Sequence, residues 1–332
     1  MDINAKQMIK VEKLLSICIP TYNRAKYLDM SLTAIAQQIL ELETNEVEIL
    51  VSDNCSSDNT QKVVEKYHEL QVNYIRNAEN IGADNNFLQC MNKAIGKYIL
   101  LLGDDDILQP GSIKYIIKVL KEKDWGCMYL SIGHKEMGKE EYDKCDDFIR
   151  RVSYMFTFMS VNIFRKDSIS LIKNPDEYKN SNLLQMPFYI SSALTRNDNV
   201  VVKGDFLRCG LAINSNGGYN PFRVFVENYL NIWKEFLEKR LISKSNYIYI
   251  KKDVYNSYTK HHVLWLLFNR ENIYNPNKGV NTGYSIENAW GILFKHYGKE
   301  SYFYISFLWC LYASFRHRVG KLVKPIIERF SK

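Results

Sequence analysis

Short apolar runs alternate with amphipathic segments along the first third of the chain. The apolar runs cover residues 14–20, 48–51, 72–75 and 98–102. Runs of this length, bounded by turn residues, are typical of buried strands, whereas the segments between them repeat their apolar residues every three or four positions, as helices do. The alternation predicts strand–helix–strand units with right-handed crossovers and a mainly parallel sheet flanked by helices, an α/β fold.

Two residues are expected to shape the first crossover. Pro20 should end the first strand, because proline has no N–H to donate to a ladder. Asn23 should cap the following helix, which is predicted to run through about residue 39 with its apolar residues on one face. Residues 21–24 then form the loop between the strand and the helix.

Polar side chains follow three of the four predicted strands. The carboxyl ends of parallel strands meet at one edge of a sheet, which is where α/β proteins bind ligands. At the end of a buried strand, three consecutive carboxylates are best explained by a divalent cation, although a charged loop before a capped helix is the plainer alternative. No dinucleotide fingerprint and no phosphate-binding P-loop motif occurs in the sequence. The polar residues at the strand ends are Thr21 and Asn23, Asp53 and Asn54, and Asp104, Asp105 and Asp106.

The pattern is less regular after residue 120. A strand is expected near 127–132, an exposed loop over the highly charged 133–151, a strand or buried helix over 156–164, and a strand pair within 197–211. The polar, glycine-containing segment 214–218 predicts a boundary, after which the pattern is helical. Three regions follow from this pattern: a regular α/β half at 1–125, a less regular half at 126–215 and a helical region at 216–332.

Composition and charge narrow the function classes. The chain has 332 residues, of which 46% are hydrophobic and 24% charged, as in a globular protein with a real core. Its seven cysteines contain no CxxC pair, which argues against a disulfide framework or structural zinc and favours a reducing cytosol. The N-terminal residues 1–13 are polar and do not resemble a secretory signal.

The positive charge is concentrated at the C-terminal end. The net charge is +7, and residues 302–332 contain six Lys or Arg against one acid. A nucleic-acid-binding protein would carry this charge on its main fold, so we expect no nucleic-acid partner. Residues 302–315 are too few to span a bilayer, but with the basic tail they predict a helix lying on an anionic membrane surface. A buried terminal helix or a homo-oligomer contact are the alternatives.

Four ordered motifs resemble those of the family-2 glycosyltransferases. They are ICIPTYNR at 17–24, VSDNCSSDNT at 51–60, NIG at 80–82 and LGDDD at 102–106, with Pro-Gly at 110–111. The resemblance covers 13–125 closely and 126–212 loosely. The opening motif and the chain length are most similar to the abequosyltransferase-like branch, which adds a sugar to a lipid-linked O-antigen unit.

The resemblance implies a GT-A fold, a nucleoside-diphosphate sugar donor, Mg²⁺ or Mn²⁺ as cofactor, and inversion at the anomeric carbon. It makes 1–125 the donor-binding half and 126–215 the acceptor-binding half. It further implies a lipid-linked surface glycan as acceptor and a cytoplasmic enzyme held peripherally at the inner face of the cytoplasmic membrane. A hard cation held by one or two carboxylates would neutralise the charge that develops on the leaving diphosphate.

Site residues follow from the same resemblance. Asp53 matches the acid that reads the base edge, and Asp105 matches the metal-ligating end of the family's DxD motif. Gly103 stands where the first acid of that motif is expected, so which neighbouring carboxylate joins Asp105 stays open. Asp106 is assigned as the second metal ligand, with Asp104 as an alternative. The full donor-binding set is Pro20, Thr21, Tyr22, Arg24, Asp53, Asn80, Gly82, Asp104 and Asp105.

The sequence identifies no catalytic base. The family's acidic residue would fall near 184–187, where no acid occurs, and the nearest acids are Asp176, Glu177 and Asp198. Asp106 also stays open for this role. Two other functions compete with glycosyl transfer: a nucleotidyltransferase, which would use carboxylates and metal at the same edge, and a non-catalytic membrane-recruited scaffold for glycan assembly.

Overall fold

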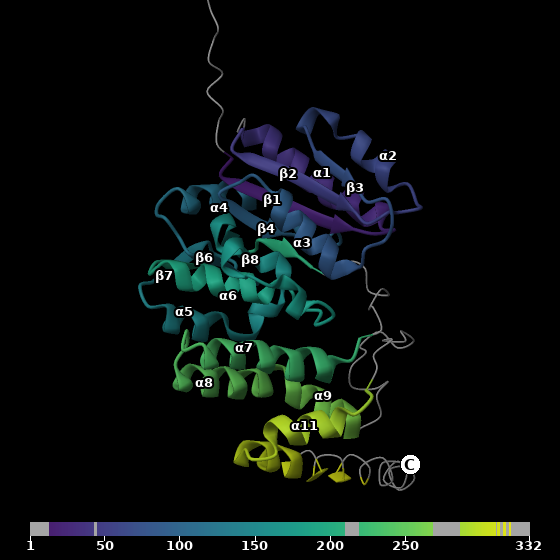
Figure 1. The fold of residues 1–332 in the computed structure, drawn as a ribbon. Coiled ribbons are helices and arrows are strands. Elements are labelled where there is room, and N and C mark those ends of the chain that lie inside the picture. Colours follow the sequence, from purple (N-terminus) through teal and green to yellow (C-terminus); the bar gives the residue numbers. More distant parts are fainter. Residues whose placement is uncertain are drawn as a thin grey trace, which may run out of the picture. The chain divides into compact units, whose positions relative to one another are not determined.

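The computed structural model describes residues 13–42, 45–209, 219–267, 286–309, 311, 312, 315, 316 and 319. The chain divides into two compact units, 1–212 and 213–332. The first unit contains a mixed eight-stranded sheet in the order β3-β2-β1-β4-β8-β6-β9-β7 (Figure 1). The α/β architecture predicted from the alternating pattern is therefore confirmed.

The four N-terminal strands are parallel and lie side by side. They are β1 (Leu15–Thr21), β2 (Val47–Asp53), β3 (Asn73–Arg76) and β4 (Tyr98–Leu101). Every residue of β1, β2 and β4 is buried, as the continuous apolar runs require of central parallel strands. Helices α1 (Ala25–Leu42), α2 (Thr60–Glu65) and α3 (Ala83–Lys93) connect them.

The second half of the sheet is mixed. β8 (Asn162–Arg165) pairs antiparallel with both β4 and β6 (Cys127–Ser131), and β9 (Asn199–Lys203) runs parallel to β6. The helices here are α4 (Ser112–Leu120), α5 (Cys145–Val152) and α6 (Met186–Thr195). A separate two-stranded ladder joins β5 (Ile107–Leu108) to β10 (Leu207–Arg208).

Two expectations about the first crossover are wrong. β1 continues through Pro20, because its pairing with β4 ends at Cys18 and the missing proline N–H is not needed there. Asn23 has a left-handed backbone, with φ at 53°. The helix N-terminus is instead capped from a distant loop, because the Ala25 amide donates to Asp58 at 2.9 Å. Asp58 also accepts bonds from the amide and hydroxyl of Thr60, so one carboxylate serves both α1 and α2.

The charged segment 133–151 is not the exposed loop that its composition suggested. It contains the edge strand β7 (Gly138–Tyr142), paired antiparallel with β9, and then α5. Its charges form ion pairs across the strand edge: Glu140 pairs with Lys203, and Glu141 with Lys123 at 2.7 Å. An edge strand that is half solvated has the charge of a loop, which explains the error.

The segment 156–164, expected to be a strand or a buried helix, contains both kinds of structure. Residues 153–161 form short 3-10 turns, and β8 follows them directly. The 3-10 segments 166–171 and 175–178 lead from β8 towards α6. The region 197–211 contains two strands, β9 and β10, but they belong to different sheets and do not pair with each other.

The second unit is helical, as predicted for the C-terminal region. It contains α7 (Tyr229–Glu238), α8 (Lys244–Val254), α9 (Lys260–Leu267) and α11 (Ala289–Tyr297). Two π-helical segments, Arg223–Asn228 and Tyr255–Thr259, precede α7 and α9. None of the helices that the structure describes is long and apolar enough to cross a membrane.

Candidate functional site

The loops after β1, β2 and β4 meet at the carboxyl edge of the sheet. The Asn54 amide donates to the Thr21 carbonyl at 2.9 Å, and the Ser57 amide donates to the Asn23 side chain at 2.8 Å. The loop after β4 joins through side chains, because the Thr21 hydroxyl donates to Asp104. Parallel strands in neighbouring positions force this convergence, and it brings together residues that lie more than eighty positions apart in the sequence.

Asp104 is buried, and both of its carboxylate oxygens are engaged. Thr21 Oγ1 donates to Oδ2 at 2.7 Å, and Arg24 Nη1 donates to Oδ1 at 3.0 Å. Burial raises the pKa of this carboxyl and Asp105 adds to the effect, although the Arg24 charge and the hydrogen bonds from Thr21 and Arg24 oppose it. The geometry makes Asp104 an anchor for Arg24.

Arg24 lies between two neighbouring carboxylates. Its Nη1 atom is also 3.5 Å from Asp105 Oδ1, and its side chain is 30% exposed. Burial alone would lower the pKa of the guanidinium, but Asp104 and Asp105 raise it by more. A guanidinium held in this way presents a fixed positive charge beside the partly exposed Asp105 carboxylate, an arrangement suited to a bound diphosphate.

Asp106 is held by a residue that sequence reasoning missed. The Ser160 hydroxyl donates to Asp106 Oδ2 at 2.5 Å and accepts from the Gly103 amide at 2.9 Å. A Cβ atom on Gly103 would lie 2.9 Å from Asp106 Oδ2 and 3.3 Å from Asp105 Oδ1. The glycine at this position of the DxD pattern therefore has a packing reason. The Asp105 and Asp106 side chains occupy the space that an acidic side chain at 103 would need.

Cys209 is a second residue that the motifs did not indicate. It follows β10, whose pairing with β5 brings it near the acidic loop. Burial, with added repulsion from Asp106 and Asp105, raises the pKa of its thiol to about 12. No local spacing signals this proximity, because Cys209 reaches the site through a ladder between segments about one hundred residues apart.

Asp53 ends β2 and is fully buried. The Tyr74 hydroxyl donates to Asp53 Oδ2 at 2.6 Å, the Ser56 amide donates to Oδ1 at 2.8 Å, and Arg76 Nε lies 3.6 Å from Oδ2. Burial and the bond to Asp53 raise the pKa of the Tyr74 hydroxyl. The Asp53 carboxylate is thus held in place by β3 and by its own loop.

The third motif supports the loop after β2. Asn54 Nδ2 donates to Asn80 Oδ1 at 2.8 Å, and the same oxygen accepts from the Gly82 amide at 2.9 Å. Gly82 has a φ of 82°, which a side chain would strain, and α3 begins directly after it. Of the other predicted donor residues, Pro20 is buried in β1 and Tyr22 is exposed.

None of the three candidate acids for the catalytic base has a described contact with this cluster. Asp198 precedes β9, which runs in the direction of β4, so it lies at the opposite, amino edge of the sheet, where it is 3.3 Å from Lys123. Asp176 pairs with Lys179 at 2.5 Å, and Glu177 accepts from Asn174 at 2.9 Å. The structure brings none of them into a described contact with the acidic loop.

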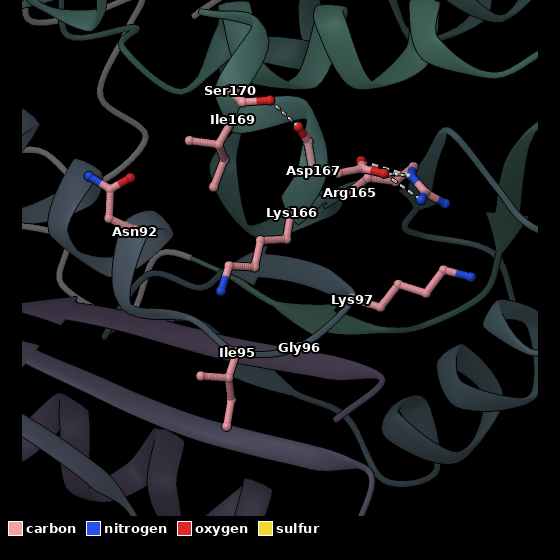
Figure 2. A pocket seen from close by; sticks show the side chains of 9 residues that line it. All are labelled: Asn92, Ile95, Gly96, Lys97, Arg165, Lys166, Asp167, Ile169 and Ser170. Carbon is pink, nitrogen blue, oxygen red and sulfur yellow. Dashed lines mark hydrogen bonds and ion pairs between the residues drawn. The ribbon is translucent and has the colours of Figure 1, made fainter. Parts of the chain in front are cut away.

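A pocket of about 640 Å³ lies at the amino edge and is separate from the acidic loop. It is lined by residues that precede β4 in the chain, including Asn92, Ile95 and Lys97, and by residues at and after the end of β8, including Lys166. Figure 2 shows Lys166 extending towards Ile95, whereas Lys97 points away, and Arg165 is tied to Asp167. Ligands of parallel sheets bind at the carboxyl edge, so we place the candidate site there and not in this pocket.

The carboxyl edge fits a hard divalent cation that takes few protein ligands. Among the described residues, no three His, Cys, Asp or Glu side chains are arranged to hold a metal ion together. The Asp105 side chain is 21% exposed. Asp104 and Asp106 are buried, with 4% and 5% of each whole residue exposed. Mg²⁺ commonly takes one or two carboxylates and completes its shell with phosphate oxygens and water.

Two curated proteins are similar to this chain over part of its length. The abequosyltransferase RfbV of Salmonella typhimurium is 34% identical over 131 residues, which cover 36% of this chain and 39% of that protein. A Campylobacter jejuni enzyme named GalNAc(5)-diNAcBac-PP-undecaprenol beta-1,3-glucosyltransferase is 30% identical over 111 residues, or 32% of this chain and 35% of its own length. The matched regions thus span well under half of either relative.

Solved structures agree on the fold. Residues 1–349 of Staphylococcus aureus TarS in complex with UDP-GlcNAc superpose with a TM-score of 0.58 at 21% identity, covering 76% of this chain and 75% of that one. The model of the family described as glycosyl transferase family 2 matches residues 16–185, slightly more than half of the chain. This protein therefore belongs to glycosyltransferase family 2 and has a GT-A fold.

Proposed function

We propose that this protein is an inverting, metal-dependent glycosyltransferase that moves a hexosyl or related sugar from a nucleoside-diphosphate sugar to a glycan acceptor. The observation that carries the proposal is the meeting of Arg24 with Asp104 and Asp105, next to the Ser160-bound Asp106, at the carboxyl edge of a family-2 chain. Cation and carboxylates side by side suit a donor whose leaving group is a diphosphate.

Each residue at the edge has a distinct part in this proposal. Asp105 and Asp106 would hold Mg²⁺ or Mn²⁺, which when bound neutralises charge on the leaving diphosphate. Arg24, fixed by Asp104, would donate to phosphate oxygens. Ser160 keeps Asp106 in position through its hydrogen bond.

The donor's nucleoside would bind over the loops after β1 and β2. Asp53 is proposed to read the base edge, and its placement at the end of β2 supports this. Tyr22 is exposed beside the loop and offers an aromatic face. Pro20 and Thr21 lead into the loop after β1. Asn80 and Gly82 support the loop after β2, because Asn80 bonds to both Asn54 and the Gly82 amide.

Transfer with inversion is a single displacement. A base takes the proton from the acceptor hydroxyl as that oxygen attacks the anomeric carbon, and the nucleoside diphosphate leaves from the opposite face. We assign no base, because Asp198 lies at the amino edge and neither Asp176 nor Glu177 has a described contact with the acidic loop. Holding both substrates in line would supply much of the acceleration.

The acceptor is proposed to be a lipid-linked intermediate of a surface polysaccharide. The Campylobacter relative is named for an undecaprenyl-linked acceptor, and the Salmonella relative is an abequosyltransferase. Such an acceptor would keep the enzyme in the cytoplasm, peripherally at the inner face of the cytoplasmic membrane.

The test is the identity of the products. Purified protein with Mn²⁺, a panel of UDP, dTDP, CDP and GDP sugars, and polyprenyl-linked acceptors should release a nucleoside diphosphate and form a glycosylated lipid. Mass spectrometry detects both products. Asp105→Asn should abolish them, whereas Asp143→Asn, at an exposed acid on the loop after β7, should leave them unchanged.

The alternatives give different products. Release of pyrophosphate together with a new nucleotide sugar would identify a nucleotidyltransferase. A chain that binds donors without forming any product across the panel would instead be a scaffold. Either result overturns the proposal.

A further inference from the structure

Large apolar side chains form an exposed stripe near the C-terminal end of the second unit. The described residues between 301 and 319 have helical backbone, and in this part of the chain exposed residues recur at alternating spacings of three and four. This spacing places them on one face of a helix. The exposed apolar stripe consists of Ile305 (68% exposed), Leu308 (64%), Tyr312 (63%), Phe315 (68%) and Val319 (39%).

The opposite side of the same segment is packed into the second unit. Phe303 is 1% exposed, with its ring 5.5 Å from that of Phe294. The Ser306 hydroxyl bonds to the Tyr255 hydroxyl, and the Phe307 ring lies 5.8 Å from that of Trp290. The segment is therefore anchored through one face, and the stripe is its outward face.

Aromatic residues flank the stripe in a way that suits a boundary between water and hydrocarbon. Trp309 is 59% exposed and Tyr304 is 45% exposed. Trp and Tyr rings are favoured at membrane interfaces, because each has an apolar body and a polar group. An exposed apolar surface of this kind on a folded protein marks an interaction site.

Charge identifies the partner. Residues 302–332 contain Arg316, Arg318, Lys321, Lys324, Arg329 and Lys332 against the single acid Glu328. A second copy of the chain would bring an equally basic segment to the same contact, whereas an anionic lipid surface complements it. Each basic residue close to such a surface strengthens binding about fivefold.

We infer that the exposed apolar stripe binds anionic phospholipid membranes from one side, and that the basic composition of residues 316–332 favours this partner. The stripe enters the boundary between headgroups and acyl chains, and the net positive charge of the segment attracts anionic headgroups. This names the membrane-facing surface of the proposed transferase, and only its purpose, access to a lipid-linked acceptor, rests on that proposal.

Vesicle binding by the full-length chain tests the inference without any donor or acceptor. The protein should sediment with vesicles of phosphatidylcholine mixed with phosphatidylglycerol, and much less with phosphatidylcholine alone. High salt should weaken the binding, because it screens the basic residues. The emission of Trp309, isolated as the difference between wild type and Trp309→Phe, should shift to shorter wavelength on binding.

Variants separate the stripe from general hydrophobicity. Leu308→Ser combined with Phe315→Ser should weaken binding at least about tenfold, because two large apolar groups leave the lipid. Leu241→Ser, at a 49% exposed leucine between α7 and α8, is the matched control and should not change it. Lys321→Glu with Lys324→Glu should weaken binding to anionic vesicles without touching the stripe, which covers the case in which the serine variant fails to fold.

Three results would overturn the inference. They are absence of wild-type binding to anionic vesicles, equal binding by the serine and charge variants, and a concentration-dependent dimer that the serine variant abolishes while vesicle binding stays absent. The last would assign the stripe to a second copy of the chain. Nucleotide binding by the same variants should stay at the wild-type level, so failure here is distinguishable from failure of the proposed transferase.

Discussion

Replacing Gly103 with alanine should destabilise the protein although it adds a single methyl group. The new Cβ would lie 2.9 Å from Asp106 Oδ2, which is closer than such contacts occur. Asp106 cannot swing away cheaply, because it is 5% exposed and Ser160 holds the same oxygen. Overpacking of this kind costs about 1–3 kcal/mol. Alanine also lowers the conformational entropy of the unfolded chain, which stabilises the protein by about 0.4–1 kcal/mol. We therefore expect the free energy of unfolding to fall by roughly 1–2 kcal/mol.

Urea denaturation measures this loss as a lower midpoint at an unchanged slope. Gly138→Ala is the matched control: no heavy atom lies within 4 Å of its Cβ position, so it should be neutral or stabilise by up to about 1 kcal/mol. Gly103→Asp, which restores the acid of the usual motif, should also weaken metal-dependent nucleotide binding, because its side chain would displace the Asp105 and Asp106 carboxylates. A Gly103→Ala variant as stable as wild type, or tighter binding by Gly103→Asp, would refute the packing explanation.

Two further predictions concern the buried carboxylates. Arg24→Met should cost about 1–3 kcal/mol, because Asp104 is left buried without its cation, and adding Asp104→Asn should recover part of it in a double-mutant cycle followed by urea denaturation. Asp58→Ala should cost about 1–2 kcal/mol at neutral pH, because two helix N-termini lose their acceptor. Burial raises the pKa of Asp58, but bonds from Thr60 and Ala25 lower it by more. Its contribution is therefore present above about pH 4 and lost as pH falls through the lowered pKa, so the difference from wild type should shrink in acid.

The N-terminal half of the fold could be predicted because three of its four strands, β1, β2 and β4, are buried on both faces. Continuous apolar runs identify such strands, and their alternation with amphipathic helices sets the topology. The errors arise where distant residues decide local structure. Asp58, not Asn23, caps α1, and β7 was mistaken for a loop because its charges are neutralised by Lys203 and Lys123 on other segments.

The candidate site also contains a part that the sequence predicts and a part that it does not. The meeting of Thr21, Asp53 and Asp104 follows from parallel strand order, so the positions of strand ends were enough to predict it. Ser160 and Cys209 reach the acidic loop through pairings far along the chain that no spacing encodes. Counting residues from a motif did not locate a base, because the counted positions 184–187 hold no acid, although the Gln185 side chain bonds to the Thr157 carbonyl, three residues before Ser160.

Metal-dependent nucleotide binding tests the central claim most directly. Calorimetric titration of UDP, dTDP, CDP and GDP into wild type, with and without Mn²⁺, should identify one nucleotide that binds at least about tenfold tighter with the metal. Asp105→Asn should lose this gain and keep the affinity measured without metal, because the base and ribose contacts are untouched. Failure of every nucleotide to bind, or an undiminished metal-dependent gain in Asp105→Asn, would contradict the assignment of the carboxyl edge as the donor site.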